Sequence, residues 1–407
     1  MNPSSGAADL VVGLDAGTSA IKVVVAECGS AGGPAVVGMG TAPSLGIKRG
    51  VVIHLDSVIA SVTQALAEAE LTAGTRIKVL DVAISGGQLG SLNSRGVVAV
   101  GRMRQVTEED THRAIEAARP LAIPEGREII QAIPQDFVVD EQDGVADPIG
   151  MAGSRLEVNL HVITGHAASL LNLFACIRRC GVGVRDTVLS PLAAAESLLS
   201  EDEKNLGVAI VDVGAGTTSI AVFDRGALCH TAVVSMGGDH ITHDLAVGLR
   251  TAPADAERLK RKYGRTFAIS IDEGETIEIA SIGGLSRRRI PRGLLTDIVA
   301  TRVEMLLEAV GRELDSAGGG ARLSAGVVLT GGGAAIRGLA DTAATMLGLP
   351  VRRASPSATG CVADLVNTAA FSTAVGVVLC AARKRRDTAP AEPRPAGRLR
   401  TLLRALR

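Results

Sequence analysis

Two stretches of this chain carry the same pattern: "LVVGLDAGTSAIKVVVAE" at residues 10–27 and "GVAIVDVGAGTTSIAVFD" at residues 207–224. Each begins with an apolar run, passes through Asp-x-Gly into a turn of Gly, Thr and Ser, and ends in a second β-branched run. Short runs of this kind, separated by turn residues, are typical of two neighbouring strands. One copy opens each half of the chain, so the sequence predicts a duplicated unit.

A third stretch, "AGVVLTGGGAAIRGL" at 325–339, predicts a strand that runs into a glycine loop and then a helix. Helical patterns at 56–70 and 167–180, and a strand-rich stretch from about 81 to 164, separate the two copies. Strands that alternate with helices favour an α/β fold, in which the functional loops follow the strand ends.

Each copy places a carboxylate, Asp15 or Asp212, at a strand end beside glycines. Glycine lets a backbone approach a ligand closely, and the free N–H groups of such turns attract phosphate oxygens. Two carboxylates repel a triphosphate. Mg²⁺ held through water by Asp15 and Asp212 removes this conflict, and Lys22 adds positive charge. For either copy alone, an Asp that only caps its own turn is the alternative. The pair and the third loop together predict a nucleotide cleft between two halves.

The composition excludes some classes of protein. The core is aliphatic, with five Phe, one Tyr and no Trp in 407 residues, so base stacking on aromatic side chains is not expected and no nucleic acid partner is predicted. The net charge is −1, but residues 383–407 hold nine Arg and Lys and two acids, so this end carries +7 and the rest carries −8. Such asymmetry indicates a basic arm for an anionic surface.

The last residues, "GRLRTLLRALR" at 397–407, predict an amphipathic helix. Its apolar stripe and basic flanks fit the surface of a membrane. About ten helical residues span only about 15 Å, so this helix lies on a bilayer and does not cross it. A helix that docks on a protein surface is the alternative. The stripe consists of Leu399, Leu402, Leu403 and Leu406, with Arg400, Arg404 and Arg407 along one edge.

Two other stretches leave alternatives open. The mostly apolar segment 365–382, followed by "RKRR", resembles a membrane span with a positive flank, but its Asn, Ser and Thr residues favour a buried core helix. Cys176 and Cys180 lie four residues apart in a helical pattern without flanking His or Cys, so buried thiols are favoured over a metal site. The N-terminus shows no signal-peptide pattern, and we expect a cytoplasmic protein.

The ordered set DAGT, DVGAGT and LTGGG resembles the phosphate-1, phosphate-2 and adenosine motifs of the actin-like ATPase superfamily. This resemblance implies an α/β, actin-like two-lobed ATPase fold with duplicated ribonuclease H-like domains, and ATP with Mg²⁺ as its ligands. The stretch "DAERLKRKYG" at 255–264 resembles the adenine-pocket helix of DnaK-type chaperones, although its Glu257 and Lys260 also fit an ordinary exposed ion pair. The implied site residues are Asp15, Gly17, Thr18 and Lys22 in the first loop, Asp212, Gly214, Gly216, Thr217 and Thr218 in the second, Glu257 and Lys260, and Gly331, Gly332 and Gly333.

Nearly the whole chain is similar to the FtsA family of bacterial cell division proteins. The matching stretches include "GIKRGVVIHLDSV", "AIPQDFVVDEQDGVADPIGMAGSRLEVNLHVIT", "GGDHITHDLA" and "FSTAVGVVL". The part at 133–164 resembles an insertion that ordinary actins and chaperones lack. The implied division is subdomain 1A at 1–84 with 165–190 and 355–386, 1C at 85–164, 2A at 191–227 with 302–354, 2B at 228–301, a linker at 387–397, and a membrane-targeting helix at 398–407.

The resemblance also implies a function. Members of this family bind ATP, polymerise, and tether FtsZ filaments to the cytoplasmic face of the inner membrane through the terminal helix, where later division proteins join. It places the C-terminal tail peptide of FtsZ on subdomain 2B, where "LSRRRIPRG" at 285–293 gathers four arginines. A solvated basic loop is the alternative for this stretch. The nominated contacts are Arg288, Arg289 and Arg292, with Arg287 beside them.

The sequence also departs from the family pattern. Ala215 stands where a glycine is frequent, and we expect its methyl to narrow the phosphate loop. Ser190 stands where related ATPases carry an acid or amide that orients water, so slow hydrolysis is expected. "ATR" at 300–302 keeps only Arg302 of an acid-Pro-Arg pattern. A sugar kinase of the same fold and a pilus-assembly platform protein are the competing interpretations.

Overall fold

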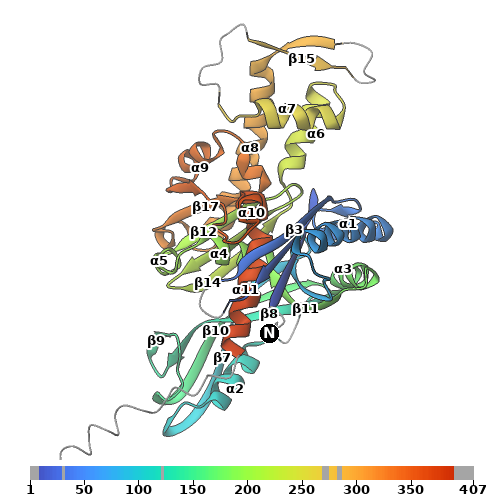
Figure 1. Ribbon diagram of the computed structural model, residues 1–407. Helices are drawn as coiled ribbons and strands as arrows, with labels where there is room; N and C mark the ends of the chain where they lie inside the picture. The colour runs from blue at the N-terminus through green and yellow to red at the C-terminus, as the bar shows by residue number, and fades with distance from the viewer. Residues whose placement is uncertain (1–8, 30–32, 121–122, 268–274, 282–286, 389–407) are drawn as a thin grey trace, which may run out of the picture.

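The computed structural model describes residues 9–29, 33–120, 123–267, 275–281 and 287–388. Two lobes lie side by side, each built on a five-stranded sheet, and a smaller subdomain extends from each of them (Figure 1). The predicted membrane helix at 398–407, and all but the first two residues of the predicted linker, lie outside the described residues.

The sheet of lobe 1 has the order β11-β6-β1-β2-β3. β1 and β2 form the antiparallel pair predicted from the first copy, with Asp15 opposite Lys22. Alternate residues of β1 point to opposite faces: Val12 and Leu14 pack with α1 and α3, and Val11 packs under α11. The elements are β1 (Leu10–Ala16), β2 (Ala20–Glu27), β3 (Ala35–Pro43), α1 (Leu55–Ala73), β6 (Val79–Ile84), α3 (Ala167–Arg179) and β11 (Gly183–Leu189).

The sheet of lobe 2 has the order β14-β13-β12-β17-β18, which repeats the connectivity of lobe 1 and confirms the predicted duplication. Helices α8 and α9 cover one face, and α4 covers the other. The elements are α4 (Ser190–Leu198), α5 (Glu201–Leu206), β12 (Val208–Val213), β13 (Thr218–Asp224), β14 (Ala227–Val234), α8 (Arg292–Ser316), β17 (Gly326–Thr330), α9 (Leu339–Leu347) and β18 (Val351–Arg353).

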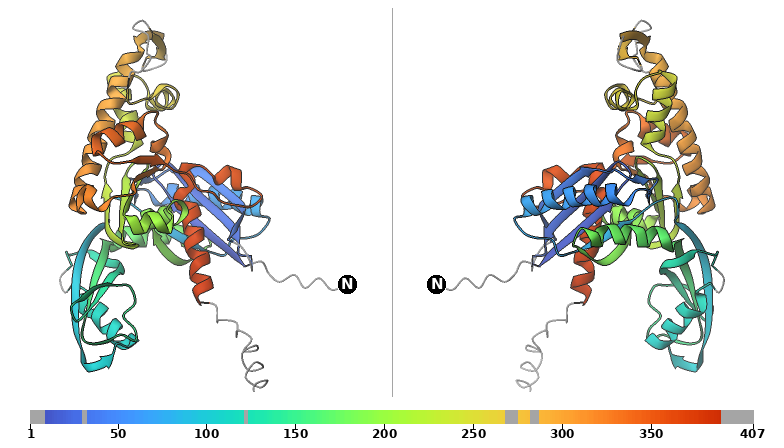
Figure 2. Two further views of the ribbon diagram at one scale, coloured as in Figure 1. Left: turned by 90° about the vertical axis from the view of Figure 1, so that its left-hand side faces the viewer. Right: turned by 90° about the vertical axis from the view of Figure 1, so that its right-hand side faces the viewer.

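The subdomain inserted in lobe 1 is a four-stranded sheet of order β7-β10-β8-β9, and α2 covers one of its faces. Thr107 begins α2 with a capping box to Asp110, which explains why the chain turns into a helix there. The subdomain lies at the opposite end of the molecule from the smaller subdomain of lobe 2 (Figures 1 and 2). Its elements are β7 (Gly90–Gln105), α2 (Glu108–Ala118), β8 (Arg127–Val139), β9 (Gln142–Val145) and β10 (Ala152–His166).

This subdomain also contacts lobe 2 directly. Its side chains bond to backbone carbonyls of β14, the edge strand of the lobe 2 sheet: Ser91 Oγ donates to Thr231 O at 2.7 Å, and Asn93 Nδ2 donates to Cys229 O at 3.2 Å. The buried imidazole of His161 lies between Asn93 Oδ1 at 2.6 Å and Thr231 Oγ1 at 2.9 Å. These contacts of Ser91, Asn93 and His161 with β14, here called the clasp, cover a strand edge that would otherwise present unpaired carbonyls.

The subdomain inserted in lobe 2 consists of two helices and a two-stranded sheet at the top of Figure 1. Ile277, Ile279 and Ile290 from the two strands join the core of lobe 2. The elements are α6 (Gly238–Gly248), α7 (Pro253–Tyr263), β15 (Thr276–Ala280) and β16 (Arg287–Pro291). A short hairpin of β4 (Ile47–Lys48) and β5 (Val51–Val52) belongs to lobe 1.

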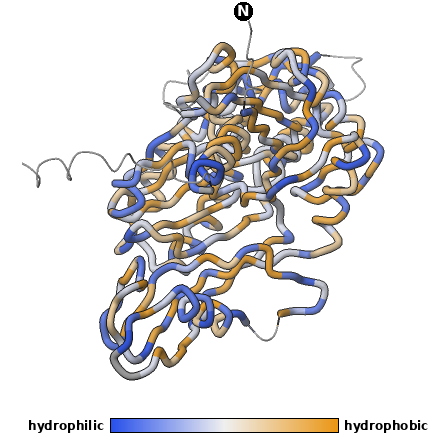
Figure 3. Tube along the Cα trace, turned by 60° about the horizontal axis from the view of Figure 1, so that its bottom comes forward, coloured by the Kyte–Doolittle hydropathy of each residue, from blue (hydrophilic) through white to orange (hydrophobic). Residues whose placement is uncertain are grey.

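The segment 365–382 is broken into α10 (Ala363–Val366), a 3₁₀ turn (Ala369–Phe371) and α11 (Ser372–Thr388). Buried residues of α11 pack against β1 and α4 in the middle of the molecule, so the prediction of a core helix is confirmed. No helix among the described residues is long and apolar enough to cross a membrane. Figure 3 shows the apolar residues, in orange, along the central segments of the molecule.

The basic run after this segment is paired with the body of the protein. Arg383 contacts Glu196 at 3.3 Å, Lys384 contacts Asp186 at 2.5 Å, and Arg385 pairs with Asp9. The last turns of α11 are therefore tied to α4, β11 and the start of β1. The thiols of Cys176 and Cys180 lie against carbonyl oxygens of α1.

Candidate functional site

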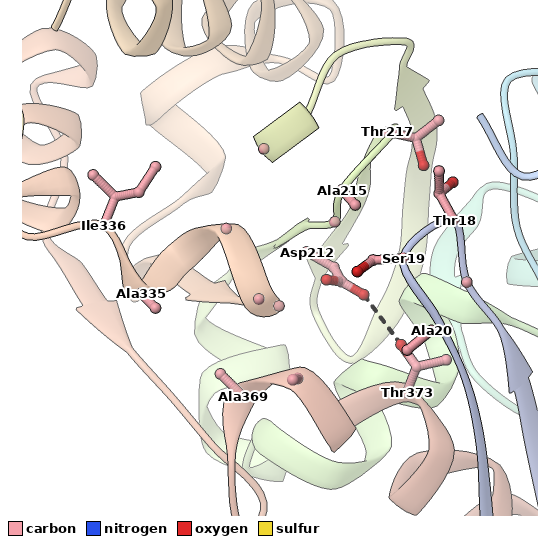
Figure 4. A pocket seen from close by; sticks show the side chains of 18 of the residues that line it. Thr18, Ser19, Ala20, Asp212, Ala215, Thr217, Ala335, Ile336, Ala369 and Thr373 are labelled. Carbon is pink, nitrogen blue, oxygen red and sulfur yellow. Dashed lines mark hydrogen bonds between the residues drawn. The ribbon is translucent and has the colours of Figure 1, made fainter. Parts of the chain in front are cut away.

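A cavity of about 640 Å³ lies between the two lobes. The loops after β1, β12 and β17 converge on it, and α7 and the first turn of α11 complete its wall (Figure 4). It is lined by every nominated nucleotide-site residue except Thr218, namely by Asp15, Gly17, Thr18, Lys22, Asp212, Gly214, Gly216, Thr217, Glu257, Lys260, Gly331, Gly332 and Gly333.

The two carboxylates that open the duplicated loops face this cavity from opposite lobes. Lys22 Nζ lies 3.3 Å from Asp15 Oδ2 and 5.8 Å from the centre of the Phe371 ring. Burial, and secondly the charge of Asp15, raise the pKa of Asp212 to about 6, although Lys22 and a hydrogen bond from Thr373 oppose the rise. Two carboxylates share a single ammonium group here, so a bound cation would relieve their repulsion.

The loops around the cavity depend on glycine at two close approaches. Gly331 has φ +86°, and a Cβ there would lie 2.2 Å from Asp212 Oδ1. A Cβ at Gly216 would lie 2.8 Å from Thr18 Oγ1, so a side chain at this position would push the second phosphate loop away from lobe 1. Glycine is the one residue that permits both the left-handed turn and the contact between the lobes.

Thr218, the exception, lies in β13 with its side chain buried, and its hydroxyl donates to Met236 O at 2.9 Å. The neighbouring Thr217 lines the cavity and its carbonyl accepts the Gly214 N–H at 2.9 Å. Ala215 also lines the cavity (Figure 4), where its carbonyl accepts the Asp239 N–H at 2.8 Å. The second loop is thus closed by backbone hydrogen bonds and joined to the start of α6.

Glu257 and Lys260 form a 2.6 Å ion pair at the far end of the cavity. Lys260 Nζ also donates to Gly238 O at 2.9 Å and to Thr242 Oγ1 at 2.8 Å, and its side chain is only 11% exposed. Burial raises the pKa of Glu257, but hydrogen bonds from Lys260, Thr242 and Arg261 outweigh it and lower the pKa to about 2. The low pKa keeps Glu257 ionised, and the hydrogen bonds of Lys260 fix the pair between α6 and α7, which distinguishes it from an ordinary exposed ion pair.

Sequence reasoning did not nominate two further residues on the cavity wall for the site. Thr373, in the first turn of α11, donates from Oγ1 to Asp212 Oδ2 at 3.1 Å (Figure 4). Ala369, just before this helix, accepts the Gly331 N–H at 3.2 Å. The stretch "FSTAVGVVL" contained the signal for Thr373, but its apolar character indicated only a core helix.

Ser190 lies on the cavity wall at the start of α4, and its hydroxyl donates to Ile84 O at 3.1 Å. Its proton is therefore directed at a backbone carbonyl, and it has no carboxylate or amide with which to hold a water. Of the described residues, Asp15, Asp212 and Glu257 alone bring a carboxylate to the cavity. None of the three lies over a second pocket in the described part of the chain that could hold a sugar, as the catalytic base of a sugar kinase would.

The nominated arginines of β16 and α8 are not equivalent. Arg288 and Arg289 are both exposed; Arg288 donates to Leu249 O, whereas Arg289 lies opposite Glu278 on β15. Arg292 pairs with Glu275, lies 5.7 Å from the centre of the Tyr263 ring, and has a side chain only 12% exposed.

Arg302, the one matched residue of the altered 300–302 segment, forms a bidentate pair with Asp244 of α6 at 2.5 and 3.0 Å. The nominated membrane residues, Leu399, Leu402, Leu403, Leu406, Arg400 and Arg404, lie outside the described residues.

Two sheets of identical order, facing each other across a cavity lined by three glycine loops, define the actin-like ATPase fold. The fold is similar to the PilM–PilN type IV pilus biogenesis complex, with a TM-score of 0.67 and 18% identity over 91% of this chain and 98% of that one. It is also similar to MreB5 of Spiroplasma citri bound to ADP, with a TM-score of 0.56 and 12% identity over 93% of this chain and 97% of that one.

The family described as "Cell division protein FtsA" matches residues 209–376, and "SHS2 domain inserted in FTSA" matches residues 86–164. A cell division protein FtsA of Pseudomonas aeruginosa is 41% identical over 93% of this chain and 90% of its own length. The chain belongs to the FtsA family of cell division proteins. This membership favours a cell division protein over a pilus-assembly platform or a sugar kinase.

Proposed function

We propose that this chain binds ATP with Mg²⁺ in the cavity between its lobes, polymerises, and tethers FtsZ filaments to the cytoplasmic face of the inner membrane. In this role it is a peripheral membrane protein at the division site that helps to assemble the division ring and receives later division proteins. Its family membership supports the division role, and the fold supports the nucleotide.

The observation that carries the nucleotide proposal is the meeting of Asp15 and Asp212 in one cavity with three glycine loops. The loops offer backbone N–H groups to phosphate oxygens. Asp15 and Asp212 would hold Mg²⁺ through water, and this ion would neutralise charge on both the carboxylates and the phosphates. Burial, and secondly the charge of Asp15, raise the pKa of Asp212, and a bound cation would offset both effects.

Calorimetry with ATP in Mg²⁺ and in EDTA tests the assignment. Asp212→Ala should remove most of the gain in affinity that Mg²⁺ provides. Asp224→Ala is the matched control, because Asp224 also ends a strand of the lobe 2 sheet but does not line the cavity. Unchanged Mg-dependent affinity in Asp212→Ala would show that the nucleotide site is elsewhere.

We further propose that the nucleotide acts mainly as a clamp between the lobes, with at most slow hydrolysis. Ser190 has no group to aim a water, and its hydroxyl is engaged by Ile84 O. A nucleotide that contacts both lobes stabilises the closed arrangement over others, which favours a conformation that can polymerise.

We place the FtsZ contact on the subdomain inserted in lobe 2, at the exposed face of β16. Arg289 is the strongest candidate, because it is exposed, whereas Arg292 is engaged by Glu275. Arg289→Glu should weaken binding of the FtsZ tail peptide at low salt, where contacts between exposed charges are strongest. Arg312→Glu, at an exposed arginine of α8, is the control. Equal peptide binding by both variants would favour the solvated basic loop.

The membrane proposal rests on the amphipathic pattern of residues 397–407. Four leucines each contribute at most about 1.5–3 kcal/mol on full burial, and ordering ten residues costs about 1–2 kcal/mol each. One tail therefore binds weakly and reversibly, and a polymer with many tails gains affinity by avidity.

Flotation with anionic vesicles tests the membrane contact. Leu402→Glu with Leu403→Glu should release the protein from the vesicles. Leu71→Glu with Leu206→Glu, at two exposed leucines of the body, should not. If the tail variant floats as well as the wild type, the anchor is not the tail.

A further inference from the structure

We propose that Thr373 is a positioning residue: its hydroxyl fixes the Asp212 carboxylate in the orientation that Mg²⁺ requires, and it does so from α11, the helix packed between the two lobes. This inference rests on the proposed Mg–ATP site and adds a residue that none of the three motifs contains. Thr373 lies 161 positions from Asp212 in the sequence, in the first turn of α11.

Both oxygens of the Asp212 side chain are restrained. Oδ2 accepts the 3.1 Å hydrogen bond from Thr373 Oγ1. Oδ1 lies against the backbone of Gly331, at a place where a Cβ would be only 2.2 Å away. A carboxylate held on one side by a hydroxyl and on the other by a glycine has little rotational freedom about its last torsion. Figure 4 shows Thr373 and Asp212 joined on the wall of the cavity.

The helix that carries Thr373 is itself fixed. Ala374 O lies so near β1 that a Cβ at Gly13 would be 2.8 Å from it, and a Cβ at Gly376 would be 1.7 Å from Ala193 O on α4. The neighbouring Ser372 shares a 2.7 Å hydrogen bond with Thr330 at the end of β17. Thr373 therefore holds its position through the packing of α11 against both lobes.

The contact lies where the lobes meet. α11 packs against β1 and β2 of lobe 1 and also against α4 and the end of β17 of lobe 2, whereas Asp212 ends the central strand of lobe 2. Asp15 and Lys22 also approach Asp212 from lobe 1. The orientation of the Asp212 carboxylate thus depends on the position of the first turn of α11 relative to the end of β12.

A partner that orients a carboxylate beside a metal typically changes metal affinity by 10–100-fold when it is lost. Thr373→Val keeps the shape and removes the hydroxyl, and Thr373→Ser keeps the hydroxyl. A structural role in helix packing would tolerate valine better than serine. A positioning role predicts the reverse order, which separates the two explanations.

The test is calorimetry of a non-hydrolysable ATP analogue with the full chain, in EDTA and over a Mg²⁺ series. For Thr373→Val we expect a half-saturating Mg²⁺ concentration about 10-fold or more above wild type, and an unchanged analogue affinity in EDTA. Thr373→Ser should behave as the wild type. Thr345→Val, which removes an exposed threonine hydroxyl of α9, is the matched control and should change neither quantity.

The outcomes separate this inference from the proposed function. If the wild type shows no Mg-dependent binding, the Mg–ATP proposal fails. If the wild type shows it and Thr373→Val matches it, only the positioning role is overturned. Hydrogen exchange of residues 372–376 in the wild type gives an independent measurement should the valine variant not fold. Exchange of this turn should slow when Mg²⁺ is added to the analogue complex, and equal exchange would overturn the inference.

Discussion

Replacing Gly376 by alanine should destabilise the protein, although helix propensity alone predicts the opposite. Alanine in a helix interior is favoured over glycine by about 1 kcal/mol. In this structure, however, the new Cβ would lie 1.7 Å from Ala193 O. Real Cβ atoms stay at least 3.0 Å from such an atom, so α11 and α4 would have to separate by 1.3 Å or more.

The helix cannot make this movement freely. Residues 374 and 376 lie about 200° apart around a helix, so Ala374 faces β1 on the side opposite α4. A Cβ at Gly13 would already lie 2.8 Å from Ala374 O, which shows how closely α11 packs there. Overpacking of this kind costs typically about 1–3 kcal/mol, and we expect the upper end of that range because both sides of the helix are blocked.

Thermal unfolding followed by circular dichroism measures the effect. A loss of about 3 kcal/mol corresponds to a fall in Tm of roughly 6–12 °C for a lobe of this size. Gly293→Ala, in the first turn of α8, is the matched control, since a Cβ there meets nothing within 4 Å and the variant should gain about 0.4–1 kcal/mol. If Gly376→Ala melts at or above the wild type, the close crossing of α11 and α4 is not present.

Three further outcomes are expected. Burial, and secondly the charge of His230, lower the pKa of His161 to about 4, so the stability that the neutral ring provides is present above pH 6.5 and is lost as the pH falls towards 4. The loss amounts to at most about 3 kcal/mol in the free energy of unfolding. His161→Gln should flatten this part of the pH profile of denaturant unfolding. Thr231→Val removes the 2.9 Å contact with His161 and should speed hydrogen exchange of β14 without changing exchange in β17. ATP turnover should stay well below about 1 per second, because Ser190 cannot orient water, and a rate within the usual kinase range of about 1–100 per second would contradict this.

The parts of the site that the sequence predicted are those in which local chemistry decides the structure. Asp15 and Lys22 lie together at the cavity because a tight turn puts them opposite each other in a hairpin. Glycines of all three loops lie at the cavity, and at Gly216 and Gly331 a side chain would meet a neighbouring atom at 2.8 Å or less, a requirement that leaves its mark in the sequence. The duplication was equally visible, since both copies keep an apolar run, Asp-x-Gly and a second β-branched run in the same order.

The parts that could not be predicted arise from packing between distant segments. Thr373 meets Asp212 only because α11 passes between the two sheets, and nothing in "FSTAVGVVL" indicates which of its polar residues faces a cavity. Thr218 carries the same motif as Thr217, yet strand alternation turns its side chain into the core. The clasp between the inserted subdomain and β14 likewise depends on which strand of lobe 2 is left at the edge.

The structure also changes the electrostatic argument for the basic end of the chain. Residues 383–407 carry +7, but Arg383, Lys384 and Arg385 are paired with Glu196, Asp186 and Asp9, which leaves +4 to act at an anionic leaflet. At about 1 kcal/mol for each basic residue near the surface, this removes about 3 kcal/mol from the attraction that the sequence alone would indicate. The basic residues in the last turns of α11 therefore hold this end of the helix against α4, β11 and the start of β1, and in the proposed membrane contact the leucine stripe has to supply more of the binding. It follows that vesicle binding by the wild type should survive high salt in part, whereas removal of Leu402 and Leu403 should abolish it even at low salt.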